Sequence, residues 1–116
     1  MDYEVNKFVD VSGSSLQGKI KTTYDKLVEL FGEPTYKDAD PYAKVNAEWT
    51  VMATVKKTGD DYALIKDFEM DEDYTDEVKF SIYNWKDGYI PTEEYEWHIG
   101  GYGFDAVDTA YEIINA

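Results

Sequence analysis

Residues 43–55 alternate between apolar and polar side chains, and this pattern constrains the fold more than any other stretch of the chain. The apolar positions are Val45, Ala47, Trp49, Val51, Ala53 and Val55. Successive side chains of a β-strand point to opposite faces of a sheet, so the spacing predicts a strand with one apolar and one polar face. Such a strand needs a sheet and a second layer that covers the apolar face.

Four further segments have strand features. Alternation and clusters of β-branched and aromatic residues predict a short strand within residues 2–11, a returning strand at 62–68, and strands at 77–88 and 94–99. Residues 12–19, with the sequence SGSSLQGK, are predicted to form a loop.

Two segments have the periodicity of amphipathic helices. Thr22 and Asp25 can form a capping pair at the start of the first, and Gly32 followed by Pro34 ends it. Its predicted apolar face consists of Tyr24, Leu27, Val28 and Phe31. The second helix closes the chain, with Asp105 as its predicted N-cap. Its predicted apolar stripe consists of Phe104, Val107, Tyr111 and Ile114. Positive φ angles are predicted for the turn before it, which contains Gly100, Gly101 and Gly103.

This order of elements predicts a single α+β domain over residues 1–116. A chain of 116 residues is long enough for one domain with its own core. The economical arrangement is an antiparallel sheet of about four to five strands with two helices packed on one face.

The charge balance constrains the partners. With 25 acidic and 11 basic side chains, the chain has a formal net charge of −14. Such a surface repels nucleic acid and anionic membranes and attracts basic surfaces, so we expect a basic protein partner. Cysteine is absent, which excludes disulfides and thiolate metal sites. No apolar run has the length of a signal peptide or a membrane span, so we expect a cytoplasmic protein.

Residues 57–77 form an acidic segment that we interpret as an insertion or a hairpin arm. Carboxylates alternate there with aromatic and methionine side chains, which favours an interface steered by charge and anchored by apolar groups. The predicted partner-binding residues of the segment are Asp67, Phe68, Glu69, Met70, Asp71, Glu72, Asp73, Tyr74, Asp76 and Glu77. Outside it, we add Glu94 and Glu96, because a second row of carboxylates would come closer to the spacing of phosphates. We also add Trp85, which we expect to be exposed and to bind, because it lies beside the Asp87-Gly88 turn. The ordered spacing of an EF-hand is missing, so no metal site is expected.

His98 is the only histidine, and strand alternation places it on one face with Glu94 and Glu96. These carboxylates would raise the pKa of a catalytic base, but no nucleophile motif accompanies the histidine. The nearby glycines match neither phosphate-loop pattern. We therefore expect no enzymatic activity and no cofactor. The alternative is a pocket around His98, Trp85 and Tyr102 that acts as a small-ligand sponge or a hydrolase.

Four motifs in order, TTYDKLVELFGEPT, NAEWTV, FSIYNWKDG and EYEWHIGG, resemble a family of small acidic proteins encoded by bacteriophages and prophages. The resemblance covers most of residues 17–114 and implies a bacterial host cell as the setting. Small acidic phage proteins include many anti-CRISPR and other anti-defence inhibitors, which often occlude a basic nucleic-acid channel. By this analogy, the partner is a basic nucleic-acid-binding protein of a defence system, such as a CRISPR nuclease or surveillance complex. A phage structural or assembly module stays open as an alternative, and the chain is expected to be a monomer or a homodimer.

Overall fold

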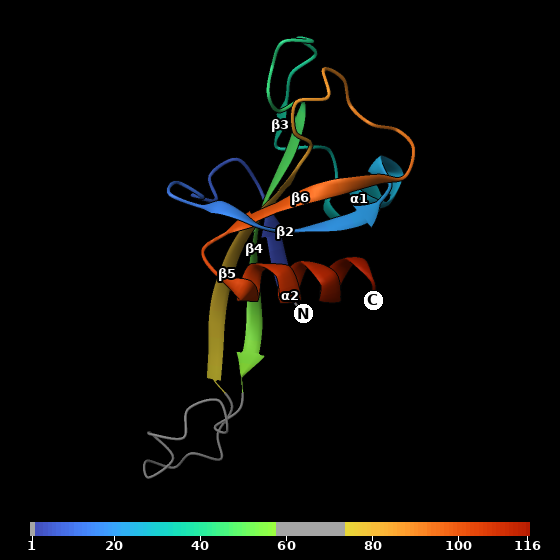
Figure 1. Cartoon of the computed structure of the whole chain (residues 1–116). Coiled ribbons are helices and arrows are strands. Elements are labelled where there is room, and N and C mark those ends of the chain that lie inside the picture. Colours follow the sequence, from blue (N-terminus) through green and yellow to red (C-terminus); the bar gives the residue numbers. More distant parts are fainter. Residues whose placement is uncertain (1, 58–73) are drawn as a thin grey trace.

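The computed structural model describes residues 2–57 and 74–116, which form a six-stranded antiparallel sheet and two helices (Figure 1). The elements along the chain are β1 (Asp2–Val5), β2 (Ser15–Thr22), α1 (Tyr24–Phe31), β3 (Tyr36–Lys37), β4 (Ala47–Lys57), β5 (Tyr74–Tyr83), β6 (Tyr95–Gly101) and α2 (Phe104–Ile114). The strands follow the order β1-β4-β5-β6-β2, and the short β3 pairs with β4 beside this path. The predicted α+β class is therefore confirmed, with one strand more than the upper expected number. The predicted returning strand at 62–68 lies outside the described residues.

The predicted loop at 12–19 is largely a strand. β2 pairs antiparallel with β6, from Ser15 opposite Gly101 to Thr22 opposite Tyr95. The register shifts between Leu16 and Gly18, so a bulge interrupts the alternation that would have revealed the strand in the sequence. Its backbone hydrogen bonds come from a partner far along the chain, which local propensity does not reveal.

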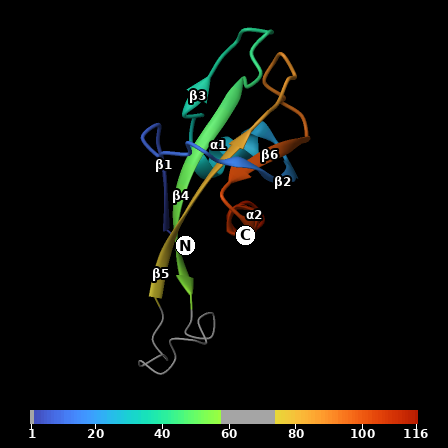
Figure 2. The same cartoon turned by 60° about the vertical axis from the view of Figure 1, so that its left-hand side comes forward.

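The core lies between one face of the sheet and the two helices (Figure 2). The helices contact each other, and α2 also contacts β2, β5 and β6. The side chains that fill this layer from the sheet are fully buried or nearly so: Ile20, Trp49, Val51, Ala53, Val78, Phe80, Ile82, Trp97 and Ile99. The alternation predicted for β4 is confirmed from Ala47 to Ala53, because its odd positions are buried.

Helix α1 begins one residue later than predicted. Thr23 is its N-cap, and the Thr23 hydroxyl accepts a hydrogen bond from the backbone N–H of Lys26 at 3.1 Å. Thr22 cannot serve because it is the last residue of β2 and pairs with β6. Gly32 ends the helix with φ of 81°, a left-handed conformation that glycine adopts without strain.

Helix α2 presents a different face to the core than predicted. Its buried residues are Ala106, Thr109, Ala110, Ile113 and Ile114. Phe104 is instead 81% exposed, and Tyr111 is also exposed. Gly103 is the N-cap, in place of Asp105. A Cβ atom at Gly101 would overlap that of Ala106, so small residues on both sides let the helix lie close to β6.

The predicted glycine turn is also wrong. Gly100 and Gly101 are the last residues of β6, and neither has a positive φ. They are required for space: a Cβ atom at Gly100 would lie 2.6 Å from the Ser81 hydroxyl and 3.3 Å from the Tyr83 ring. Gly100 thus allows the open face of the sheet to pack closely around Tyr83, whereas Gly101 makes room for Ala106 of α2.

Candidate partner-binding surface

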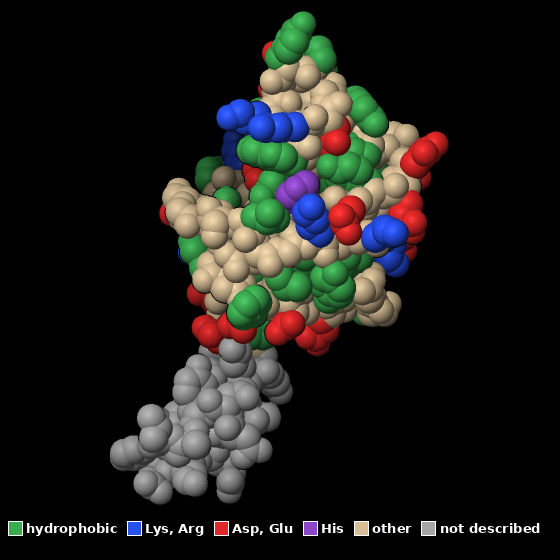
Figure 3. Space-filling model, viewed as in Figure 1, with side chains coloured by type: hydrophobic (Ala, Val, Ile, Leu, Met, Phe, Trp, Pro, Cys, Tyr) green, Lys and Arg blue, Asp and Glu red, His purple; other side chains and the backbone are tan. Residues whose placement is uncertain are grey.

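The sheet face opposite the helices carries a row of side chains that crosses five strands. In register, Tyr36 of β3 lies opposite Glu48 of β4, which lies opposite Tyr83 of β5. Tyr83 lies opposite His98 of β6, which in turn lies opposite Lys19 of β2. Directly opposed residues point to the same face, so the five side chains form one cross-strand row. In Figure 3 the histidine is visible on this face among hydrophobic, basic and acidic side chains.

At one end of this face, a buried asparagine pair joins two loops. The Asn84 side-chain oxygen accepts hydrogen bonds from the backbone N–H groups of Asn46 at 2.8 Å and Ala47 at 2.9 Å. The Asn84 amide nitrogen lies 3.1 Å from the Asn46 side-chain oxygen, a carboxylate oxygen of Asp87 and the carbonyl of Tyr89. Both asparagines are fully buried, so water cannot reach their polar groups. The network supplies the hydrogen-bond partners that water would otherwise provide.

The same network holds the loop of residues 38–46 against the loop of residues 84–94. The Asn46 amide donates to the carbonyls of Asp38 at 2.9 Å and Asp40 at 3.1 Å. The Lys86 N–H donates to the Lys44 carbonyl at 2.6 Å. Lys86 has φ of 59°, a conformation that costs a non-glycine residue energy and that this contact helps to maintain. The two loops accordingly lie side by side in Figures 1 and 2.

The joined loops present aromatic side chains to solvent. Tyr42 is 93% exposed, Tyr89 is 66% exposed and Trp85 is 40% exposed. The exposure expected for Trp85 is confirmed, whereas its role in binding stays a prediction. Its ring contacts that of Tyr83 edge-on, with centroids 6.2 Å apart. Rigid loops that expose aromatic groups are common in binding surfaces, because little side-chain entropy is lost on contact.

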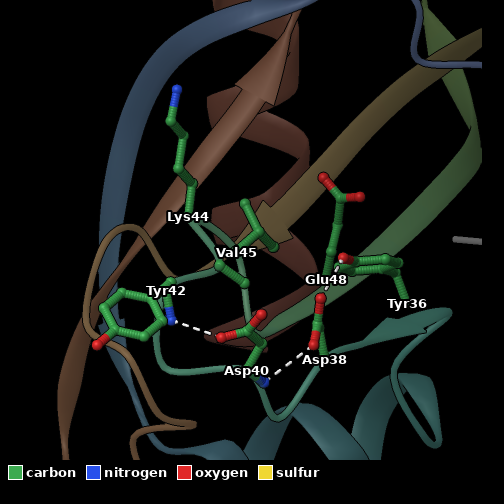
Figure 4. A pocket seen from close by; sticks show the side chains of 8 residues that line it. Tyr36, Asp38, Asp40, Tyr42, Lys44, Val45 and Glu48 are labelled. Carbon is green, nitrogen blue, oxygen red and sulfur yellow. Dashed lines mark hydrogen bonds between the residues drawn. The ribbon is translucent and has the colours of Figure 1, made fainter.

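A cleft of about 560 Å³ opens between β3, the loop of residues 38–46 and the start of β4 (Figure 4). We call it the Glu48 cleft; it is lined by Tyr36, Asp38, Asp40, Tyr42, Ala43, Lys44, Val45 and Glu48. Asp38 accepts hydrogen bonds from the Tyr36 hydroxyl at 3.1 Å and the Asp40 N–H at 2.9 Å. Asp40 accepts one from the Tyr42 N–H at 2.9 Å. The cleft thus combines aromatic walls with three carboxylates and one lysine.

Glu48 is the least compensated carboxylate of the cleft. It is half-buried, and burial raises its pKa. Within residues 2–57 and 74–116, the Lys37 ammonium lies 3.9 Å from a Glu33 carboxylate oxygen and forms an ion pair with it. Glu48 has no cationic partner among the described residues. The Glu48 charge in turn contributes to the raised pKa of Tyr83, after the larger effect of burial. The pKa of Tyr36 is raised mainly by its hydrogen bond to Asp38.

Glu48→Gln is expected to stabilise the protein at pH 7 and to lose this advantage in acid. The folded pKa of Glu48 lies above the ordinary value of 4.5, so the contribution of this one side chain to wild-type stability is greatest below that value. As pH rises through the folded pKa of Glu48, the side chain becomes charged and this contribution to wild-type stability is lost. Glutamine does not titrate, so the variant has no such loss. The groups around Glu48 are Tyr36 of β3, Asp38 and Lys44 of the cleft loop and Tyr83 of β5.

Urea unfolding of both proteins at pH 7 and near pH 4 measures this effect. The matched control is Glu112→Gln at an exposed position of α2, with an expected change within about 0.5 kcal/mol at either pH. Equal destabilisation by Glu48→Gln at both pH values would show that the carboxylate is compensated in the fold.

His98 is a partly buried member of the row. Burial lowers its pKa, and the positive charge of Lys19 lowers it further, against smaller opposing effects of Asp87 and Glu96. Glu96 thus raises the pKa of His98 as expected, but burial and Lys19 outweigh it and the net shift is downward. Its ring stacks on that of Tyr83 with centroids 5.4 Å apart, and its Nδ1 atom is buried without a hydrogen-bond partner in the described structure. This environment disfavours the charged form and favours a packing role.

Of the alternative pocket of His98, Trp85 and Tyr102, the first two rings both contact Tyr83, whereas Tyr102 lies elsewhere. Tyr102 lines a second cleft, of about 160 Å³, between β5 and the start of α2. Its hydroxyl donates to the Ser12 carbonyl at 2.7 Å. Neither this cleft nor the Glu48 cleft is lined by His98 or Trp85.

The predicted partner-binding residues lie in three places. Asp67, Phe68, Glu69, Met70, Asp71, Glu72 and Asp73 lie outside the described residues. Tyr74 begins β5, and Asp76 and Glu77 follow it as exposed residues. Glu94 precedes β6 and Glu96 lies within it, both exposed.

The two predicted rows of carboxylates are far apart. Since His98 pairs with Tyr83 in an antiparallel register, Glu96 is level with position 85. Glu77 lies eight positions away along the strand direction, or about 26 Å. The exposed acids of β5 and those of β6 thus belong to opposite ends of the sheet. Trp85 lies at the β6 end, where its N–H approaches the Tyr95 hydroxyl at 3.4 Å.

The Glu48 cleft was missed in the sequence. Its signal is the segment YKDADPY at 36–42, where tyrosines flank two aspartates and a proline. Taken alone, this pattern indicates an acidic turn, because aspartate and proline favour turns. Only the pairing of β3 with β4 adds Glu48 to it.

The described residues contain neither a metal-binding group nor a membrane-spanning helix. Within 2–57 and 74–116, no three histidine, aspartate or glutamate side chains are grouped so as to hold a metal ion. The helices α1 and α2 are both too short and too polar to span a bilayer. Comparison with protein-family models, with curated proteins and with solved structures finds no match to this chain.

Proposed function

We propose that this protein is a non-enzymatic, phage-encoded inhibitor of the anti-CRISPR type, acting in the cytoplasm of the bacterial host. It binds a basic nucleic-acid-binding surface of a defence protein, such as a CRISPR nuclease or surveillance complex, and blocks access of nucleic acid. The observation that carries the proposal is the projecting ribbon formed by β4 and β5, which leads into the acidic segment.

The ribbon extends past the rest of the sheet (Figure 1). The β4–β5 register continues to Lys57 opposite Tyr74. By contrast, β1 pairs with β4 only between Val51 and Thr54. The ladder of β6 on β5 covers only Ser81 to Tyr83. Among the described elements, the last three residue pairs of the ribbon therefore have no strand on either side.

The charge of this region favours a basic partner. Residues 58–73 contain seven acidic side chains and one lysine. Asp76 and Glu77 continue the negative charge onto the exposed surface of β5. Negative charge concentrated in this part of the sequence would steer association with a positively charged groove. The carboxylates would compete there with the phosphate groups of nucleic acid. Exposed aromatic residues such as Trp85, at the other end of the sheet, would supply a separate apolar contact.

We call the acidic side chains between residues 67 and 77 the acidic arm. Neutralising them is expected to abolish inhibition. It should also slow association by on the order of 100-fold at low salt, because electrostatic steering is lost. The arm variant combines D67N, E69Q, D71N, E72Q, D73N, D76N and E77Q. The matched control neutralises the same number of exposed acids elsewhere, through D2N, E4Q, D25N, E29Q, E33Q, D108N and E112Q. Both variants halve the formal net charge of −14, so they separate position from total charge.

The measurement is capture of a partner from bacterial lysate by the tagged full chain, at low and high salt. We expect a basic nucleic-acid-binding protein that high salt releases, that the arm variant fails to capture, and that loses bound nucleic acid when the wild type is added. Equal capture by the arm and control variants would overturn the role of the arm. Capture of no nucleic-acid-binding protein would overturn the proposal.

A further inference from the structure

We propose that the Glu48 cleft binds the guanidinium group of an arginine side chain on the basic partner, as a second contact apart from the acidic arm. This inference rests on the proposed function for the identity of the partner. The affinity of the cleft for a guanidinium group can be measured without that partner.

The position of Glu48 between two aromatic rings is the first argument. Tyr36 and Tyr83 are its direct cross-strand neighbours on β3 and β5, so all three side chains point to one face. Figure 4 shows the Glu48 side chain passing beside Tyr36, with its carboxylate directed away from Asp38. A guanidinium group could stack on an aromatic ring while it donates two parallel hydrogen bonds to the carboxylate.

The charges of the cleft are the second argument. Asp38 and Asp40 are oriented by hydrogen bonds from within the chain, whereas no described residue donates one to the carboxylate of Glu48. Lys44, the cation that lines the cleft, extends along its side in Figure 4 and forms no ion pair with a described carboxylate. The cleft therefore has an excess of negative charge with one half-buried acceptor still available.

The half-burial of Glu48 favours arginine over lysine. An ammonium group is compact and strongly hydrated, so its transfer into a partly enclosed site carries a large desolvation cost. Guanidinium is planar, more weakly hydrated and shaped to pair with a carboxylate through two donors. The raised pKa of Glu48 agrees with an acceptor that lacks its counter-charge in the free protein.

The cleft is also rigid before binding. The Asn46 amide holds the carbonyls of Asp38 and Asp40, and Asn84 holds the backbone of Asn46. The Thr35 hydroxyl next to β3 donates to the Glu48 carbonyl at 3.0 Å. A site whose walls are fixed in the free protein loses little conformational entropy when it binds a ligand.

The test is an NMR titration of the full chain with N-acetyl-arginine methylamide, using N-acetyl-citrulline methylamide as a ligand of similar shape without charge. We expect the arginine probe to shift amide signals of the Glu48 cleft, with a dissociation constant on the order of 1 mM. Glu48→Gln should weaken this binding about tenfold, since a hydrogen bond to a charged group is lost. The control is Asp108→Asn, which removes one negative charge from an exposed position of α2 and should leave binding unchanged.

Three results would overturn the inference. They are equal binding of citrulline and arginine, unchanged binding in Glu48→Gln, and shifts confined to other parts of the surface. The spectrum of Glu48→Gln away from the cleft serves as the folding control. The titration uses no partner. If it fails and the lysate capture succeeds, only the binding of arginine by the Glu48 cleft is wrong. Failure of capture beside a successful titration would remove the proposed function alone.

Discussion

Replacing Trp49 with alanine is expected to lower the free energy of unfolding by about 4 kcal/mol, the typical cost of removing a large buried ring. Trp49 is 0% exposed, and its ring centroid lies 5.5 Å from that of Trp97 and 5.6 Å from that of Tyr24. Its indole N–H donates to the Gly32 carbonyl at 2.8 Å, at the end of α1. The substitution therefore leaves a cavity between sheet and helix and removes a hydrogen bond that positions the helix.

Urea unfolding followed by circular dichroism measures this loss, with Trp85→Ala as the matched control. Trp85 lies outside the core, so its removal should change the free energy of unfolding by about 1 kcal/mol or less. Trp49→Phe retains most of the apolar contact and should cost about 1–2 kcal/mol through the lost hydrogen bond and the smaller ring. Equal effects of Trp49→Ala and Trp85→Ala would contradict the position of the core.

Replacing Asn84 with alanine is expected to lower the free energy of unfolding by about 3 kcal/mol, because buried groups lose their partners. The N–H groups of Asn46 and Ala47 would both lose the acceptor that the Asn84 side chain supplies. The surrounding donors and acceptors pair with both the oxygen and the nitrogen of the Asn84 amide, and an apolar side chain cannot replace these hydrogen bonds.

The control is Asn115→Ala at the exposed end of α2, where a change within about 0.5 kcal/mol is expected. Hydrogen exchange gives a second measure, because the Asn46 and Ala47 amides should lose protection in Asn84→Ala. If urea unfolding and amide protection were both unchanged in Asn84→Ala, the proposed coupling of the two loops would be wrong. The same variant should bind the arginine probe more weakly, since the cleft loop would no longer be held in place.

Local signals predicted much of the fold. The alternation in β4 placed Trp49 on the apolar face that the core covers. The apolar spacing in α1 and its end at Gly32 were also recognisable from the sequence. These features depend on the period of a strand or helix and on the conformational freedom of one glycine, which are properties of neighbouring residues.

Other features depended on contacts between distant residues. β2 has a bulge and a distant partner in β6, so local alternation could not reveal it. The buried face of α2 was decided by Gly101, which brings Ala106 close to the sheet and leaves Phe104 in solvent. A helical sequence with apolar residues on more than one side does not specify by itself which side packs.

The candidate sites show the same division. Net charge and the acidic composition of residues 57–77 are properties of the sequence, and they determined the expectation of a basic partner. The ribbon that projects toward this segment and the Glu48 cleft follow from strand register, which aligns Tyr36, Glu48 and Tyr83 from three separate parts of the chain. Composition and period are local, whereas register is set by which strands pair; only the tertiary structure could therefore place a half-buried carboxylate between two aromatic rings.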